Sequence, residues 1–581
     1  MVTDPWQKAR EDVIKAVAEV IPQLAIPKTR LKKIKLVNHI DEPPSYKMGD
    51  LACSISFPFG KIKKVSPRKI AEDIIDKIHR PRSVYLIKLA GAYVNFFLKF
   101  GEFAKAVVTE ASKDTFGKGE KKKEKVMIEY SQPNPLKAFH IGHVRNTVLG
   151  ESLSRIMKEA GFDVIQANLF NDIGMHVAKT LWCYKKYHDG EKAHTNVSKW
   201  IGTIYRDACK KIEEDPKNKE EADEILKHLE AQDNEEITKL WKQFRKWSVD
   251  EFKEIYKELD AHFDVDFYES DLKPRGRELV EELKKKKIAK KSKGAIIIDL
   301  KKDDLPVWLL LKSDGTALYS TQDLALAEEK FKKFKIDKSI YVVGSEQRLH
   351  FQQLFKTLQK MGFRKAKKCY HLAYALVALR SGKMSSREGT AILYSDLKHE
   401  MLKKAMNEVA ERNPEMAVKT QNELAEKIMM SAMKYSMLNV GNNKTIFFDW
   451  DTALEFEGNT GPYLQYATVR AKRILEKAGK KPTLAGIQFK LLDSKDAQRL
   501  IKQIAKLPSV IREAAETYQP HIISNYAYSL ADKFSTFYTT NPVIEAETPE
   551  LKAARIALVN ATYKTLQKAL YLLGIEEPKR M

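Results

Sequence analysis

Residues 126–170 read VMIEYSQPNPLKAFHIGHVRNTVLGESLSRIMKEAGFDVIQANLF and contain the clearest indication of the fold. This stretch opens on a short β-like run, Val126–Tyr130, and closes on a second one, Val164–Phe170. Between them, one apolar helical face is predicted by the spacing of Leu149, Leu153, Ile156 and Met157. Gly161 is well placed to end that helix. This order of strand, helix and strand predicts the opening of a doubly wound parallel sheet.

The regions on either side of this unit differ from it in character. The first hundred residues mix helical periodicity with a strand-like ending, and the charged linker GKGEKKKEK follows at 117–125. About residues 181–293 are polar, highly charged and helical in pattern, which predicts an insertion within the α/β region. Strand-like runs return at 295–300 and 340–343, and after about Tyr394 only helical patterns remain.

The helical patterns near the C-terminus indicate a bundle. Two apolar stripes recur at helical spacing there, and we expect each to be the inward face of a helix. They are Leu500, Ile504, Leu507 and Ile511, and Ile523, Ala527, Leu530, Phe534 and Phe537. We therefore predict three domains: an α+β N-terminal domain (1–118), an α/β core with a parallel sheet (119–393) and an all-α helical bundle (394–581).

The charge of the chain points to an anionic partner. Its formal net charge is +24 and its pI is near 9.4, and so basic a surface attracts polyanions such as nucleic acids. A lysine-rich solvated surface is the simpler alternative. Four cysteines lie far apart without a CxxC pair, so we expect neither a disulfide framework nor a protein-held metal. No apolar run reaches about 18 residues and no signal peptide is recognisable, which predicts a cytoplasmic protein with no membrane partner.

The segment Phe139-His-Ile-Gly-His143 stands at the start of the helix after the first strand. The N-terminus of a helix presents free N–H groups and the positive end of the helix dipole, so it suits phosphate. Gly142 lets a nucleotide lie against the helix, and His140 and His143 share a face from which they can donate to phosphate oxygens. Two histidines that only cap a helix are the alternative.

A second candidate segment is Lys383-Met384-Ser385-Ser386, in the glycine-flanked stretch SGKMSSREGT. A lysine and hydroxyl groups on a loop can follow a pyrophosphate group as it leaves. Taken alone, such a loop is more often ordinary surface.

The order of these features resembles class I aminoacyl-tRNA synthetases: a HIGH segment after the first strand, a KMS-type loop late in the same domain, and a basic helical domain after it. The surrounding stretches resemble arginyl-tRNA synthetases in particular, from Gly49 to the final residue. These stretches are GDLACSISF, GAYVNFFL, IEYSQPNPLKAFHIGHVRNTVLGE, FNDIGMH, KSDGTALYSTQDLALA, VVGSEQRLHFQQLF, GNTGPYLQYATVRAKRIL, YSLADKFSTFY and LLGIEEPKRM. The resemblance implies an N-terminal domain that grips the tRNA elbow, a Rossmann-like catalytic domain and a helical anticodon-binding domain.

The resemblance also implies an activity: L-arginine is activated with ATP, assisted by Mg²⁺, and transferred to the 3′-terminal adenosine of tRNA(Arg). It places Glu129, Tyr319 and Asp323 around the arginine side chain, and Asn134 and Gln347 at the α-amino and carboxylate end. A guanidinium is planar, permanently charged and rich in donors, so carboxylates and a hydroxyl suit it. His140, Gly142, His143, Lys383, Met384 and Ser385 are the implied ATP-binding residues.

The chain departs from the family pattern at Ser386, where many members carry a second lysine. The leaving pyrophosphate still needs a positive charge. Some members that lack this lysine use one just before the HIGH histidine, and Lys137 fits that role, with Arg387 a weaker candidate. The catalytic set is therefore His140, His143, Lys137, Lys383 and Ser385.

Contacts with tRNA are implied for five further residues, Asn95, Phe96, Tyr466, Tyr538 and Met581. Tyr466 and Tyr538 match aromatic residues that can stack on anticodon-loop bases. For Asn95 and Phe96 strand packing is an equal alternative. The resemblance suggests a monomer. The alternative function is a catalytically inactive synthetase-like tRNA-binding protein, for which Ser386 is the only support.

Overall fold

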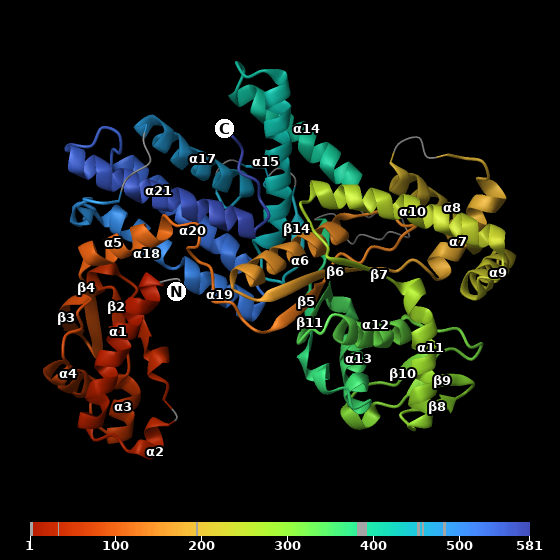
Figure 1. The fold of residues 1–581 in the computed structure, drawn as a ribbon, viewed down its shortest axis with the longest axis horizontal. Coiled ribbons are helices and arrows are strands. Elements are labelled where there is room, and N and C mark those ends of the chain that lie inside the picture. The colour runs from red at the N-terminus through yellow and green to blue at the C-terminus, as the bar shows by residue number, and fades with distance from the viewer. Residues whose placement is uncertain are drawn as a thin grey trace. The chain divides into compact units, whose positions relative to one another are not determined.

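The computed structural model describes residues 4–32, 34–192, 196–379, 392–449, 452, 454–455, 458–479 and 484–581 (Figure 1). The chain forms two compact units, each assembled from three separate segments. The first unit joins Met1–Glu120, Tyr466–Glu513 and Tyr526–Ala569, and the second joins Lys121–Gln465, Ala514–Asn525 and Leu570–Met581.

The second unit is built around a five-stranded parallel sheet in the order β12-β11-β5-β6-β7. Its strands are β5 (Lys125–Glu129), β6 (Asp163–Phe170), β7 (Val265–Tyr268), β11 (Lys338–Gly344) and β12 (Cys369–Tyr374). The chain runs from β5 to β6 on one side and later places β11 on the other side of β5. Such a reversal opens a crevice at the carboxyl ends of the two strands that flank it. The prediction of a doubly wound parallel sheet is confirmed.

Helix α6 (Ile141–Glu159) packs directly against the end of β5. A Cβ atom on Gly150 would lie only 2.1 Å from the Tyr130 ring, so the backbone of α6 can approach β5 only with glycine there. The helix ends where the sequence predicts, since Gly161 follows it with a φ of +92°.

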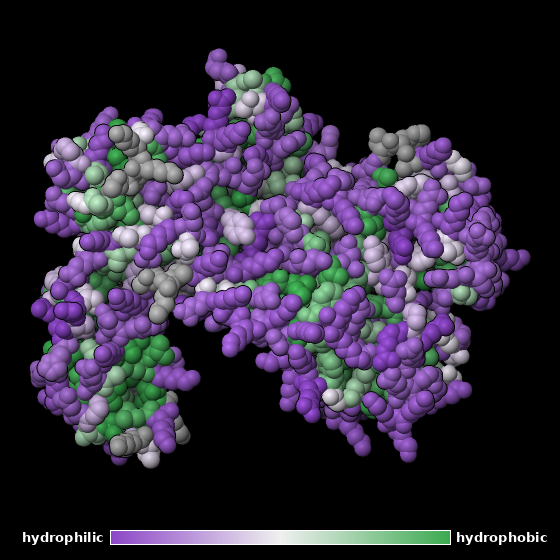
Figure 2. Space-filling view, viewed as in Figure 1, coloured by the Kyte–Doolittle hydropathy of each residue, from purple (hydrophilic) through white to green (hydrophobic). Residues whose placement is uncertain are grey.

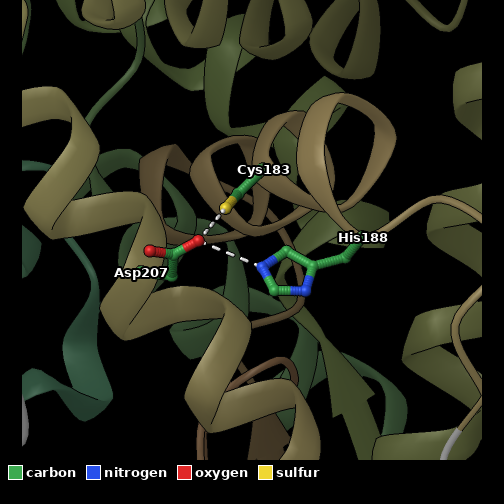
Figure 3. A group of neighbouring side chains, drawn as sticks. All are labelled: Cys183, His188 and Asp207. Carbon is green, nitrogen blue, oxygen red and sulfur yellow. Dashed lines mark hydrogen bonds and ion pairs between the residues drawn. The ribbon is translucent and has the colours of Figure 1, made fainter.

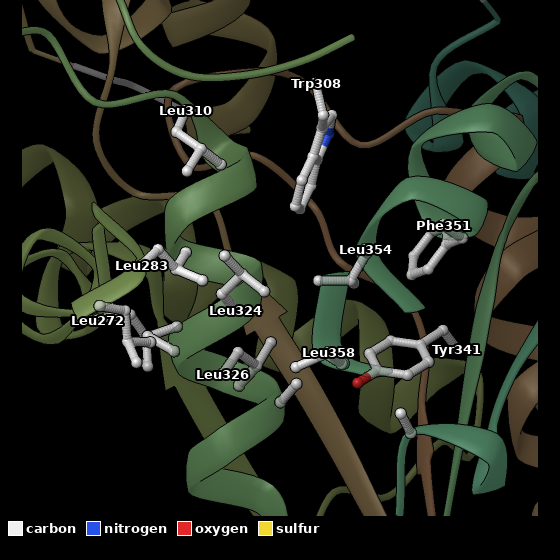
Figure 4. Close-up of a cluster of buried hydrophobic side chains, with 14 of the residues drawn as sticks. Leu272, Leu283, Trp308, Leu310, Leu324, Leu326, Tyr341, Phe351, Leu354 and Leu358 are labelled. Atoms are coloured by element: carbon white, nitrogen blue, oxygen red, sulfur yellow. The ribbon is translucent and has the colours of Figure 1, made fainter. Parts of the chain in front are cut away.

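The other face of the sheet carries a large apolar core with α11 (Glu269–Lys285), α12 (Tyr319–Lys333) and α13 (Arg348–Lys360). An antiparallel sheet in the order β10-β9-β8 adds to it, with β8 (Ala289–Ser292), β9 (Ala295–Ile298) and β10 (Trp308–Leu311). Figure 4 shows Leu272, Leu283, Trp308, Leu310, Leu324, Leu326, Tyr341, Phe351, Leu354 and Leu358 within this core. The core fixes the strand ends from which the cleft residues project.

The predicted insertion at 181–293 is not continuously helical, because strand β7 separates α11 from four earlier helices and strand β8 follows α11. The four earlier helices are α7 (Met175–Tyr187), α8 (Val197–Glu214), α9 (Lys217–Ala231) and α10 (Glu235–Glu258). The expectation of a helical insertion as far as residue 293 is wrong, because β7 belongs to the central sheet and β8 to the small antiparallel one. Each is four residues long and lies in a charged region, so its alternation is too short to recognise against the helical pattern.

Two expectations for the C-terminal part also need correction. Helices α14 (Tyr394–Arg412) and α15 (Val418–Leu438) are followed by a strand, β14 (Ile446–Phe448), which pairs in parallel with β13 (Val377–Leu379). The apolar stripe from Leu500 to Ile511 is buried but lies on two helices, α18 (Lys495–Ala505) and α19 (Leu507–Thr517). Pro508 lies at the second position of α19, where its missing N–H group costs no helical hydrogen bond.

The first unit contains a four-stranded antiparallel sheet in the order β1-β2-β4-β3. Its strands are β1 (Ile40–Asp41), β2 (Leu51–Cys53), β3 (Val84–Ala90) and β4 (Tyr93–Leu98), and its N-terminal helices are α1 (Pro5–Val20), α2 (Lys28–Leu31), α3 (Ser56–Lys63), α4 (Pro67–Lys77) and α5 (Phe100–Ala111). Two ion pairs join the N-terminal segment of this unit to C-terminal helices of the same unit. They link Asp50 with Lys502 and Glu42 with Lys506.

The remaining long helices are α17 (Gly461–Ala478), α20 (His521–Thr540) and α21 (Pro549–Leu572). The five apolar residues of the second predicted stripe all lie on α20 and are buried. Among the described residues, no helix combines the length and the apolar character that a membrane span requires. Hydrophilic side chains cover most of the face shown in Figure 2.

Candidate active site

A cleft of about 1280 Å³ lies at the carboxyl ends of β5 and β11. Several residues that the sequence analysis selected line this one cleft, although they come from β5, the loop after it, α6, α12 and the segment after β11. They are Glu129, Asn134, His140, Gly142, His143, Tyr319, Asp323 and Gln347. The predicted nucleotide-binding segment and the predicted arginine-binding residues therefore share one cavity.

The loop after β5 is strained where it enters the cleft. Ser131, Gln132 and Leu136 all have positive φ values, of 74°, 48° and 66°, which non-glycine residues rarely adopt. Hydrogen bonds hold this backbone: the Ser131 N–H donates to the Asn146 side chain at 2.9 Å, and the Gln132 N–H donates to the Asn168 side chain at 3.0 Å. Strain of this kind is typical of functional loops, and the sequence analysis did not identify it.

The two histidines of the HIGH segment stack face to face, with ring centroids 3.9 Å apart. The Nδ1 atom of His140 accepts the Gly142 N–H at 3.1 Å, and the Nδ1 atom of His143 accepts the His140 N–H at 3.3 Å. Burial, together with the charge of Lys137, lowers the pKa of His140 to about 4, and burial also lowers the pKa of His143. Both rings are therefore neutral at pH 7, and each must carry its proton on Nε2, where it is available as a donor.

Gly142 is required by the same arrangement. A Cβ atom at this position would lie 2.9 Å from Cε1 of His140. A side chain there would push the His140 ring away from the helix start and would also fill the surface on which a nucleotide can lie.

At the other end of the cleft, Asp323 is oriented by a buried histidine. Its carboxylate lies 2.6 Å from Nε2 of His350, and the ring of Tyr319 lies 4.8 Å from the His350 ring, centroid to centroid. Tyr319 and Asp323 are four residues apart on α12, so both project from one helical face. A hydroxyl and a carboxylate are thus held side by side.

Glu129 is in a different electrostatic state from Asp323. Its buried carboxylate forms an ion pair with Lys330, which is fully buried on α12, and it accepts a hydrogen bond from Gln132 at 2.7 Å. The Lys330 ammonium also lies 3.8 Å from the centroid of the Tyr341 ring. Lys330 therefore compensates the charge of Glu129, which the sequence analysis had treated as a free negative group.

The sequence analysis missed Glu269, the first residue of α11, which also lines the cleft. The pKa of its carboxyl is raised to about 8, mainly by burial and in part by the nearby charge of Asp323, while Lys273 opposes the shift. An acidic residue directly after a strand could have indicated a cleft residue at this position. The sequence did not predict strand β7, so this indication was not recognised. A cationic ligand would relieve the repulsion between Glu269 and Asp323.

The charge of the cleft is opposite to the charge of the protein. Among the described residues, nine carboxylates and four lysines line it, although the chain carries a formal charge of +24. The acidic cleft suits a cationic small molecule, whereas the basic chain suits a polyanion.

Lys137 lies beside the HIGH segment, and its ammonium is 5.2 Å from the centroid of the Tyr205 ring. Its charge contributes to the lowered pKa values of His140, His143 and His176. Lys383, Met384 and Ser385 lie outside the described residues, as do Ser386 and Arg387. Among the described residues, the carbonyl oxygen of Ile392 accepts the backbone N–H of Ile141 at 3.0 Å.

The residues selected for tRNA contact have different surroundings. Tyr466 and Tyr538 are each partly exposed, and the Arg470 guanidinium lies 4.6 Å from one ring centroid and 5.3 Å from the other. Met581 is half-buried at the chain end. Asn95 and Phe96 are buried on β4, with 3% and 0% exposure, which favours strand packing over contact with tRNA.

Three family models match the chain in order along its length. They are described as arginyl tRNA synthetase N terminal domain (residues 8–98), tRNA synthetases class I (R), catalytic domain (residues 105–450) and DALR anticodon binding domain (residues 464–581). An arginine–tRNA ligase of Clostridium acetobutylicum is 36% identical over 547 residues, which cover 93% of this chain and 96% of the relative. The arginine–tRNA ligase of Treponema denticola is 35% identical, with 98% of each chain covered.

Solved structures agree with these matches. The arginyl-tRNA synthetase of Thermus thermophilus superposes with a TM-score of 0.80 at 26% identity, covering 98% of this chain and 100% of that one. The arginyl-tRNA synthetase of Plasmodium falciparum, at 20% identity and 99% coverage of both chains, has a TM-score of 0.78 and shares the fold.

Proposed function

Because the chain belongs to the arginyl-tRNA synthetase family, we propose that its central cleft is where arginine, ATP and the 3′ end of tRNA(Arg) react. Its activity is that of an ATP-dependent arginine–tRNA ligase, and these relatives give no support to the inactive alternative. The observation that carries the proposed site is the acidic, arginine-compatible end of a cleft that also contains the HIGH histidines.

The proposed reaction has two steps. In the first, an arginine carboxylate oxygen attacks the α-phosphorus of ATP, and the bond to the β-phosphate breaks with loss of pyrophosphate. In the second, the 2′-hydroxyl oxygen of the terminal adenosine attacks the adenylate carbonyl carbon, AMP leaves, and the hydroxyl proton is released to solvent. No covalent enzyme intermediate is required, so the residues act by positioning and by electrostatic stabilisation.

The geometry supports a division of roles at the arginine end. Asp323, which is held by His350, and Glu269 both line the cleft, and their negative charges would repel each other. Tyr319 adds a hydroxyl group beside them. We assign the guanidinium to these three groups. Glu129, compensated by Lys330, is then better suited to the α-amino end together with Asn134 and Gln347.

At the nucleotide end, His140 and His143 present neutral Nε2–H donors for phosphate oxygens. Donors fixed by backbone contacts need no reorganisation as negative charge develops. Lys137 supplies positive charge beside them and stands in for the absent second lysine of the KMS-type loop, while Lys383 and Ser385 act from that loop. The tRNA then contacts Tyr466 and Tyr538 by stacking, with Met581 a further contact.

Mg²⁺ prefers oxygen ligands and retains several waters, and the cleft offers carboxylates of the kind that suit it. An ion held there together with ATP would neutralise phosphate charge. We further propose a monomer that works in the cytoplasm.

The test is arginine-dependent exchange of pyrophosphate into ATP, measured with tRNA present. We expect Asp323→Asn to lower kcat/KM for arginine about 100-fold, because a desolvated charge that faces a guanidinium is lost. Asp303→Asn is the matched control, since Asp303 pairs with Lys356 and Lys360 outside the cleft. If Asp323→Asn stayed within about threefold of wild type, the proposed arginine site would be wrong.

A further inference from the structure

A second group of potential ligands lies in the helical insertion, away from the residues that line the cleft (Figure 3). Cys183 is on α7, His188 follows the last residue of α7, and Asp207 is on α8. One atom from each, Sγ, an imidazole nitrogen and a carboxylate oxygen, lies within 4.8 Å of the other two. We propose that these three side chains form a binding site for Zn²⁺.

The spacing of the ligand atoms suits a tetrahedral ion. Asp207 Oδ2 lies 3.5 Å from Cys183 Sγ and 3.0 Å from His188 Nε2. Ligands bound to zinc at about 2.0–2.3 Å lie about 3.3–3.7 Å from one another at the tetrahedral angle. One Zn²⁺ therefore fits among the three atoms with small side-chain shifts, and water completes the fourth position.

The hydrogen-bonding state of His188 is the strongest indication of a cation. Its Nδ1 atom lies 2.9 Å from Glu191 Oε1, while its Nε2 atom lies 3.0 Å from Asp207 Oδ2. A neutral imidazole has a single N–H, so the lone pair of its other nitrogen would face a carboxylate. A cation between Nε2 and Asp207 removes that repulsion. The Nδ1–H donated to Glu191 is then the outer carboxylate contact that metal-bound histidines usually make.

The alternative occupant of the site is a proton, which would make His188 an imidazolium between two carboxylates. Cys183 favours the metal, because its buried Sγ adds a soft ligand that an imidazolium would not need. The ammonium group of Lys211 lies 4.0 Å from a carboxylate oxygen of Asp207 and also lies over the Tyr187 ring.

A combination of thiolate, imidazole and carboxylate selects Zn²⁺ over Mg²⁺ or Ca²⁺, which take oxygen ligands. Binding releases the Cys183 thiol proton to solvent. The ion would join the C-terminal end of α7 to α8, and α7 begins at Met175, which lines the active-site cleft. Its role is therefore to stabilise the insertion rather than to take part in arginine transfer.

The experiment measures zinc in the full-length protein, purified without added metal and then equilibrated with Zn²⁺. We expect about one zinc per chain, a rise in Tm on adding Zn²⁺, and, with Co²⁺ in its place, a thiolate-to-cobalt charge-transfer band. Cys183→Ser should abolish the band, and Glu191→Gln should weaken metal binding about 10- to 100-fold. Cys209→Ser is the matched control, because Cys209 lies on α8 two residues after Asp207 but outside the group.

Wild-type protein that takes up no zinc, or whose Co²⁺ form lacks the charge-transfer band, would overturn the proposal. So would an equal loss of metal in Cys209→Ser and Cys183→Ser. Because the cobalt spectrum is recorded on wild-type protein, the result stands even if Cys183→Ser fails to fold. Aminoacylation plays no part in these measurements, so they are independent of the proposed active site.

Discussion

Glu129 and Asp323 are both carboxylates of the cleft, but their neighbours give them different electrostatic properties. Lys330 forms an ion pair with the first, and His350 orients the second. A buried carboxylate with a buried lysine partner adds little net charge to a ligand site, whereas one beside another unneutralised acid adds a strong preference for a cation. Recognition of a guanidinium therefore depends on which carboxylates are compensated.

Lys137→Ala should reduce tRNA-dependent pyrophosphate exchange about 100-fold, because the charge that compensates the leaving pyrophosphate is lost. Lys137→Arg should recover part of the rate, since it keeps the charge. Lys199→Ala is the control: this lysine is on the same helix as Tyr205 but pairs with Asp396. An unchanged rate in Lys137→Ala would remove Lys137 from the catalytic set.

The pKa of Glu269 predicts a pH dependence of arginine binding. With a folded pKa of about 8, the carboxyl is mostly protonated in free protein at pH 7 and ionises as the pH rises. The KM for arginine should therefore fall about tenfold between pH 6.5 and pH 9. Glu269→Gln should bind arginine more weakly and lose this dependence. A parallel pH profile in the variant would contradict the role of Glu269.

The same shift predicts the effect of Glu269 on stability. A carboxyl whose pKa is raised from 4.5 to about 8 on folding binds its proton more tightly in the folded state. Between those two values the unfolded chain is ionised and the folded protein is not, so stability falls as the pH rises. Thermal unfolding of Glu269→Gln should lack this decrease, and the variant should be the more stable protein at pH 9.

At the scale of elements, the cleft depends on how closely α6 approaches β5. Tyr130 follows β5 and packs against Gly150, and its hydroxyl donates to Glu151 at 2.8 Å. This contact holds the middle of α6 beside the end of the strand that carries Glu129, and the HIGH segment stands at the start of the same helix.

Gly150→Ala should destabilise the protein by about 1–3 kcal/mol, because its Cβ would lie 2.1 Å from the Tyr130 ring and overpack the contact. The better helix propensity of alanine offsets at most about 1 kcal/mol of this. Urea unfolding measures the difference. Gly441→Ala is the control, since its Cβ would meet no atom closer than 3.8 Å. Equal stability of the two variants would show that α6 has room to move.

At the scale of the whole molecule, one chain combines a strongly basic composition with an acidic cleft. The two charges serve different ligands. A polyanion responds to the long-range field of the whole protein, whereas the arginine that we place in the cleft responds to the carboxylates that line it.

Because of this separation, we expect salt to affect the binding of tRNA strongly and the binding of arginine only slightly. The Kd for tRNA should rise at least tenfold between 50 mM and 200 mM salt, because binding releases counterions from the RNA. Arginine binding, measured by calorimetry in the same buffers, should change by less than about threefold, because its partners are partly desolvated. A tRNA affinity that does not depend on salt would contradict attraction of the RNA by the basic charge of the chain.

The compact units follow packing rather than the order of the chain. The predicted limits at 118 and 393 remain predictions, but α14 and α15 belong to the unit of the parallel sheet. Later helices, including α18, belong to the unit of the N-terminal sheet. A boundary inferred from composition marks a change of pattern, and contacts between distant segments decide which elements fold together.

The amino-acid sequence was enough to predict the family, the doubly wound sheet, the HIGH helix and most of the side chains that line the cleft. These features follow from the spacing of apolar residues and from motifs of a few residues, and both are visible among residues that are neighbours in the sequence. Only the tertiary structure decided that Lys330 compensates Glu129, that Glu269 joins Asp323, that Asn95 and Phe96 are buried, and that Cys183, His188 and Asp207 meet. Each of these depends on side chains from separate elements, whose approach is set by packing that no local pattern encodes.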